Sequence, residues 1–208
     1  MPKLNDRMYR VMSLLSATEN EKLIESDFYV EGYATTIESR YLLWEMDGWK
    51  CYEIIARNAF AGTDMSDVIM QFDHCGKVYA RQSNGSLVLV VDNIGLKIGA
   101  DLSRSAGAKD LYEEINSKLV TKMSWAFVPD RMSRTYDDIN KTITITIEHV
   151  KKIYDVSAVS IPANDQTSIA ARADDGSTDS AGEELAIIRK AAADKEQIKL
   201  LIEMEVSK

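Results

Sequence analysis

The sequence has few of the residues on which metal and redox chemistry depend. Its 208 residues include two histidines and two cysteines, and none of them shows zinc-site or Cys-x-x-Cys spacing. Two thiols are also too few for a disulfide framework, which favours a reducing, intracellular setting. We therefore expect a protein without a metal or another cofactor.

Long apolar runs and an excess of positive charge are also absent. No apolar stretch approaches the roughly 20 residues that cross a bilayer, and residues 1–16 lack the apolar core of a signal peptide. The net charge is −8, whereas proteins that bind nucleic acid usually carry a basic patch. We expect a cytoplasmic protein that binds neither a membrane nor a nucleic acid.

What the chain does contain is a globular domain with a polar tail. It is 45% hydrophobic and 28% charged, which is typical of soluble globular proteins. We predict a poorly defined leader over residues 1–26, a core domain over 27–172, an acidic flexible linker over 173–182 and a C-terminal helix over 183–208. The linker consists of small, polar and acidic residues, and tails of this composition often mediate association.

Short strand-like segments dominate the core domain. Alternating or continuous apolar runs bounded by turn residues cover residues 27–36, 49–55, 68–74, 85–92, 95–102, 120–128, 142–149 and 152–161. Between Ala106 and Leu119 the period changes to three and four residues, which predicts a helix with Ser105 as its N-cap. We predict a mainly β, α+β fold: a small antiparallel β-barrel with a few flanking helices and a C-terminal helical tail.

One of these strands carries a serine on its less bulky face. Met123, Trp125 and Phe127 are large and apolar, and small residues lie between them. This period of two predicts that Ser124 faces away from the bulky side chains. The pattern by itself does not indicate catalysis, because most strand serines are solvated or hydrogen-bonded to backbone.

Any mechanism that uses an imidazole has two candidates, His74 and His149. His74 ends an apolar strand beside Gly76, where a side chain can reach the rim of a barrel. His149 continues the isoleucine face of its strand, which is typical of a partly buried, hydrogen-bonded imidazole. Cys75 adjoins His74, but neighbours on a strand point to opposite faces, which argues against a thiol enzyme.

Common catalytic motifs do not occur in the sequence. It has no phosphate loop, no dinucleotide-binding glycine motif, no HExxH and no GxSxG nucleophile elbow. A strand serine, a histidine from another strand and a third orienting group form an arrangement that chemistry allows on any fold. The residues alone leave that arrangement open beside an inert structural role.

Several short stretches follow a recognisable order between residues 30 and 170. They are Glu31-Gly32-Tyr33-Ala34, Glu53-Ile54-Ile55 with Asn58-Ala59-Phe60, the His74 strand, Gly95-Leu96, the helix before Met123-Ser124-Trp125-Ala126-Phe127, and Tyr154-Asp155-Val156-Ser157-Ala158-Val159 leading to Pro162-Ala163-Asn164 and Thr167. This order resembles the prohead (capsid maturation) protease family of tailed bacteriophages. That family is distantly similar in fold to the herpesvirus assemblin proteases.

The resemblance implies a serine endopeptidase on a small barrel. It implies Ser124 as the nucleophile and His74 as the general base. The family's third member is acidic or histidine, and Asp155 matches the acidic residue of the family's acid-Val-Ser-x-Val strand. We take Asp155 as the third member, with His149 and Glu148 as the alternatives.

The sequence departs from the commoner family pattern at two places. Trp125-Ala126-Phe127 follows the serine where Gly-Phe is frequent, and Cys75 follows the histidine where an acidic residue is common. Neither departure removes a reacting group. Both bear on the local geometry.

The resemblance also implies partners and a place of action. The expected substrates are the scaffold protein, the major capsid protein and the protease itself, inside the assembling prohead in the host cytoplasm, with self-association as a further expectation. The alternative is a catalytically inert structural or scaffolding protein of capsid assembly on the same fold. The two differ in whether Ser124, His74 and one of Asp155 or His149 converge.

Overall fold

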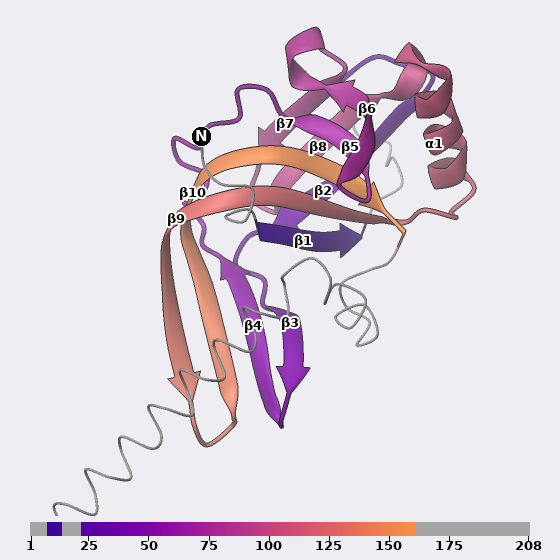
Figure 1. Cartoon of the computed structure of the whole chain (residues 1–208). Helices are drawn as coiled ribbons and strands as arrows, with labels where there is room; N and C mark the ends of the chain where they lie inside the picture. Colours follow the sequence, from indigo (N-terminus) through magenta and orange to yellow (C-terminus); the bar gives the residue numbers. More distant parts are fainter. Residues whose placement is uncertain (1–7, 14–21, 161–208) are drawn as a thin grey trace, which may run out of the picture. The chain divides into compact units, whose positions relative to one another are not determined.

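The computed structural model describes residues 8–13 and 22–160 (Figure 1). These residues form ten strands, arranged in two sheets, and one α-helix. The elements are β1 (Met8–Ser13), β2 (Tyr29–Thr36), β3 (Tyr41–Met46), β4 (Trp49–Ile55), β5 (Ile69–Phe72), β6 (Cys75–Arg81), β7 (Leu87–Val91), β8 (Gly95–Asp101), α1 (Ala106–Asn116), β9 (Lys122–Asp137) and β10 (Thr142–Val159). The predicted linker and C-terminal helix lie outside the described residues.

β10 organises the larger, seven-stranded sheet. It is 18 residues long and pairs antiparallel with β9 along nearly its whole length. On its other side it pairs in parallel with β4 and then, further along, with β5. The alternation of threonine and isoleucine puts Ile143, Ile145 and Ile147 on a buried face. The sheet therefore gathers strands from both halves of the domain around one long strand (Figure 1).

The mainly β character is confirmed, but the closed antiparallel barrel is wrong. β1 and β3 end the main path of the larger sheet, β2 and β7 end the smaller one, and no pairing among the described strands joins one edge to the other. Four pairs of consecutive strands are antiparallel, namely β3–β4, β5–β6, β7–β8 and β9–β10. In contrast, β4 and β5 reach β10 from far along the chain and lie parallel to it. Short-range sequence spacing does not reveal such crossovers.

The two strands predicted over residues 142–149 and 152–161 are one continuous strand. No glycine, proline or asparagine interrupts residues 148–152, so nothing in the sequence supports a reversal of the chain there. Instead, register shifts against β9 between Ile147 and Asp155 bend the strand. The bend lets one strand serve two neighbours in turn, β4 and then β5.

The helix prediction is confirmed, with an end that comes three residues early. α1 begins after Ser105, whose side chain accepts a hydrogen bond from the backbone N–H of Ala108 at 3.1 Å. The described part of the chain otherwise contains only 3-10 turns, at Gln82–Asn84 and Leu102–Arg104, in place of further flanking helices. No helix within residues 8–13 and 22–160 is long and apolar enough to cross a membrane.

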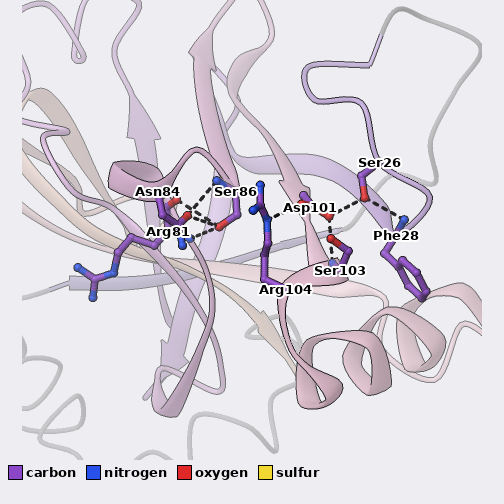
Figure 2. A network of polar contacts seen from close by, with 8 residues as sticks. All are labelled: Ser26, Phe28, Arg81, Asn84, Ser86, Asp101, Ser103 and Arg104. Carbon is purple, nitrogen blue, oxygen red and sulfur yellow. Dashed lines mark hydrogen bonds and ion pairs between the residues drawn. The ribbon is translucent and has the colours of Figure 1, made fainter.

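A network of polar side chains fixes the junction between the smaller sheet and α1. Figure 2 shows Ser26, Ser103 and Arg104 converging on Asp101, the last residue of β8. The backbone N–H of Asp101 donates to the carbonyl of Ser86 at 2.9 Å. Burial acts to raise the pKa of Asp101, but the hydrogen bonds outweigh it and lower the pKa to about 2.

Part of the segment predicted as a leader belongs to the larger sheet. β1 pairs antiparallel with β9, and Val11 lies opposite Ser124 in the register. The strand that carries Ser124 therefore has a neighbour on each side, β1 and β10. This pairing supports the backbone of β9 at the position of the serine.

Candidate functional site

His74 lies in the two-residue turn that joins β5 to β6. Phe72 and Cys75 face each other across the hairpin, and the residues between them, Asp73 and His74, have φ of 48° and 56°. A left-handed backbone at both central residues is typical of a type I′ turn, and Asp and His are among the residues that tolerate it. His74 therefore projects from a tight turn, where its strand had been predicted to continue.

The imidazole of His74 contacts the carboxylate of Asp155 on β10. Nδ1 of His74 is 2.5 Å from Oδ1 of Asp155, and the two side chains are 12% and 5% exposed. A carboxylate can only accept, so Nδ1 carries the proton, and Nε2 is the nitrogen that can accept one. Ser157 Oγ donates to the same Asp155 oxygen at 2.6 Å. These bonds orient the ring and partner the buried carboxylate.

Ser124 lies on the same face of the sheet as Asp155. It is directly opposite Ser157 in the β9–β10 register, and Ala126 is opposite Asp155. Paired residues project to the same face, and so do residues two apart on one strand. Trp125 belongs to the other face, where its ring stacks on Phe127 with centroids 3.9 Å apart. The predicted orientation of the serine is thus the one that the register gives.

The hydroxyl of Ser124 is buried and has no hydrogen bond to another described residue. The residue is 0% exposed, and its Oγ has no hydrogen-bond partner among the described residues. Leaving a buried hydroxyl unsatisfied costs about 1–3 kcal/mol, so such groups are rare and call for an explanation. A nucleophile held ready for a substrate is one explanation of that kind.

His149 belongs to a separate cluster. Its Nδ1 is 2.5 Å from Oδ1 of Asp130 and its Nε2 is 2.9 Å from the carbonyl oxygen of Ala61. The hydrogen bond from His149 also lowers the pKa of Asp130. His149 precedes Ser157 by eight residues on β10, or roughly 25 Å at about 3.3 Å per residue. The structure does not bring His149 or its neighbour Glu148 to His74.

Comparison with known proteins agrees with the order of segments in the sequence. The family model described as caudovirus prohead serine protease matches residues 15–180. The chain belongs to this family. No significant match was found among curated proteins or among solved structures. The distant likeness to the assemblin proteases therefore stays a prediction.

In this prohead protease family member, Cys75 adjoins His74 in the chain, but its thiol contacts backbone. Cys75 is exposed on the hairpin, with its Sγ 3.7 Å from the carbonyl of Phe72, and Cys51 is buried in β4. Within the described residues, no group of three or more histidine, cysteine, aspartate or glutamate side chains could hold a metal ion. The thiol alternative gains no support from this geometry.

Two residues at the His74–Asp155 pair had no role predicted from the sequence: Ser157, which contacts Asp155, and Asp73, which lies in the turn beside His74. Ser157 was part of the Asp-Val-Ser pattern, and its spacing of two from Asp155 was a signal that the side chains share a face. Asp73 binds Ser160 beyond the end of β10. That contact joins residues 87 positions apart, and no local sequence pattern predicts it.

Proposed function

We propose that this family member is a serine endopeptidase that cleaves proteins of the assembling capsid. The observation that carries the proposal is the 2.5 Å contact between His74 and Asp155, on the sheet face that also bears Ser124. A partly buried imidazole paired with a carboxylate is the usual orienting arrangement for a general base beside a serine. Membership in the prohead serine protease family supports the same reaction class.

The proposed mechanism is acyl transfer. Ser124 Oγ attacks the peptide carbonyl carbon and forms a C–O bond while its proton passes to Nε2 of His74. When the C–N bond breaks, His74 returns that proton to the departing amine and an acyl-enzyme remains. Water then attacks the ester in the same way, and Ser124 regains its proton. Asp155 holds Nδ1–H and stabilises the imidazolium that forms in each step.

The burial of Ser124 adds an opening step to this mechanism. Ser124 is 0% exposed, so we propose that its surroundings rearrange before Oγ reaches a peptide carbonyl. We therefore propose that the protease is tested best beside its assembling substrates, where any natural trigger for opening is present.

The proposed substrates follow from the family. They are the scaffold protein, or a scaffold segment of the major capsid protein, and the enzyme is proposed to act inside the prohead in the host cytoplasm. Residues 183–206, outside the described part of the chain, are proposed to help incorporate the protease into the shell. The segment from 171 to 182 is a proposed site of self-cleavage.

Co-expression with the cognate capsid and scaffold proteins tests the proposal. We expect wild type to shorten the capsid or scaffold protein and Ser124→Ala to leave both intact, as measured by intact mass. Ser133→Ala, on the exposed half of the same strand, is the matched control and should process normally. Normal processing by Ser124→Ala would refute the serine mechanism. Intact substrates beside wild type would favour the inert structural alternative.

Self-cleavage is measured in the same samples. If the protease cuts its own chain between residues 171 and 182, wild type loses mass and Ser124→Ala keeps the full mass of 208 residues. An equally shortened Ser124→Ala protein would show that another protease makes the cut. The cleavage of capsid protein is scored independently of this result.

A further inference from the structure

The turn that carries His74 is tied to the end of β10 by its other central residue, Asp73. The carboxylate of Asp73 accepts two hydrogen bonds from Ser160, from the backbone N–H at 2.9 Å and from Oγ at 2.7 Å. The backbone N–H of Asp73 donates to the carbonyl of Ala158 at 2.9 Å. Three hydrogen bonds thus join one turn residue to the last turn-facing part of β10 and to Ser160, which directly follows that strand.

This attachment lies at the end of the β5–β10 ladder, next to His74 in the chain. β5 has only four residues, and its ladder to β10 ends at the pair Phe72 and Ala158. Beyond that pair, Asp73 supplies the turn's contacts with the end of β10, and His74 is the next residue. The left-handed backbone of the turn is strained for residues other than glycine and persists only where its surroundings hold it.

We propose that Asp73 is a positioning residue, which holds the imidazole of His74 against Asp155 by clamping the β5–β6 turn to Ser160. Its effect on the reaction rate rests on the proposed function. Its effect on the His74 ring does not, because the contact between the ring and Asp155 exists whether or not the protein cleaves a substrate.

The alternative is that Asp73 only helps to form the turn and does not position His74. The two roles can be distinguished by substitution. Glycine adopts a left-handed backbone without a steric cost, so Asp73→Gly keeps the turn and removes the clamp. Asp47 in the β3–β4 turn has φ of 52°, close to the 48° of Asp73. Asp47→Gly is therefore the same substitution in the same backbone region on another hairpin, and it serves as the matched control.

Nuclear magnetic resonance of the ring proton gives a readout that needs no activity. The chain has two histidines, so a His149→Gln background leaves His74 as the source of imidazole signals. In that background we expect a protected, downfield Nδ1–H signal from the bond to Asp155. Asp73→Gly should broaden or abolish it, while Asp47→Gly keeps it. An unchanged signal in Asp73→Gly, or an equal loss in Asp47→Gly, would overturn the proposal.

Two further variants separate the clamp from a general loss of structure. Asp73→Asn keeps an acceptor for the Ser160 N–H and a polar group beside Ser160 Oγ, so we expect it to retain the Nδ1–H signal. Ser160→Ala removes one of the two carboxylate bonds at an exposed residue and should weaken the signal without unfolding the protein. Loss of the signal in Asp73→Asn to the same extent as in Asp73→Gly would contradict a clamp made of hydrogen bonds.

Capsid protein processing supplies the second readout. Misplacing a catalytic group by about 1 Å can cost about 100-fold in rate, so we expect Asp73→Gly to slow processing by about 10–100-fold and Asp73→Asn to stay within about 3-fold of wild type. If wild type cleaves and Asp73→Gly cleaves equally fast, the clamp is refuted and the proposed function stands. If wild type does not cleave, the proposed function fails. The Nδ1–H signal of His74 then tests by itself whether Asp73 positions the ring.

Discussion

Two features hold His74 in place: the backbone conformation of its turn and the contact of its ring with Asp155. Its own backbone is left-handed, with φ of 56°, a conformation that histidine tolerates better than most residues other than glycine. Its ring is fixed by Asp155, and Asp155 is fixed in turn by Ser157. The position of a single imidazole therefore depends on the turn between β5 and β6 and on two residues of β10.

Substituting Ser157 tests whether the position of the His74 imidazole depends on the hydrogen bonds of Asp155. Ser157 itself takes no part in the proposed reaction steps. Ser157→Ala removes the hydrogen bond to Asp155 Oδ1 and leaves the carboxylate with one fewer donor. We expect capsid protein processing to slow by about 10-fold, the equivalent of roughly 1.4 kcal/mol, because one neutral-to-charged hydrogen bond is lost. Time courses of cleavage measure this.

The control for Ser157→Ala is a serine of the same sheet away from the pair, such as Ser133. An effect on thermal unfolding without an effect on the cleavage rate would contradict the role given to Ser157. Because both variants are serine-to-alanine changes on neighbouring strands, differences in side-chain volume do not confound the comparison.

The two histidines are told apart by a second prediction at the residue scale. We expect His74→Gln to abolish processing of the capsid protein, because the proposed base is lost, and His149→Gln to process as wild type does. His149 bonds Asp130 and the carbonyl of Ala61, far along β10 from Ser157. Loss of processing in His149→Gln with normal thermal stability would restore His149 as a candidate for the third member.

Among the elements, the ones that local pattern determines could be predicted, and those that depend on distant partners could not. α1 was predictable because its period and its cap, Ser105, lie within one segment. The extent of β10 was not, because bulges between Ile147 and Asp155 replaced the expected turn. Its parallel pairing with β4 and β5 depends on contacts far apart in the sequence, which periodicity does not report.

The junction between β8 and α1 gives a pH prediction at the scale of elements. The pKa of Asp101 is about 2 in the folded chain, below the roughly 3.9 of an unfolded aspartate. Its contribution to stability is therefore fully present above about pH 4 and is lost as the pH falls through about 2. Unfolding free energies measured by denaturant titration between pH 2 and 5 should show this slope, with less of it in Asp101→Asn.

Asp101→Asn also tests the network at neutral pH. The amide keeps the size of the side chain but weakens the bonds from Ser26, Ser103 and Arg104, so we expect a loss of about 1–3 kcal/mol in the free energy of unfolding. Equal stability and an unchanged slope between pH 2 and 5 would show that the carboxylate does not stabilise this junction.

β1 is a test of how far the strand of Ser124 depends on its neighbours. Deleting residues 1–13 removes the six register positions that pair with residues 122–127 of β9. We expect the free energy of unfolding to fall by about 2–4 kcal/mol, since several backbone hydrogen bonds of roughly 0.5–1.5 kcal/mol each are lost. Chemical denaturation of the deletion variant beside wild type measures this. Unchanged stability would mean that β1 does not support β9.

For the molecule as a whole, the sequence predicted the mainly β character of the fold but not the frame that holds the proposed catalytic groups. Ser124, His74 and Asp155 came from a family resemblance, and the structure places His74 against Asp155 on the face that bears Ser124. The predicted barrel was wrong, because the closure of a barrel depends on pairing between strands that are distant in the sequence. Asp73 and Ser157 had no assigned role, because their roles arise only when β10 and the β5–β6 turn meet.

The central claim is that Ser124 and His74 act as one unit in cleaving a capsid or scaffold protein. The most direct measurement is the initial cleavage rate, during co-expression, of Ser124→Ala, His74→Gln and the double variant. Residues that act as a unit are non-additive, so each single variant should lose nearly all activity and the double variant should be no slower than either. Substantial cleavage by Ser124→Ala, or losses that multiply in the double variant, would contradict the claim.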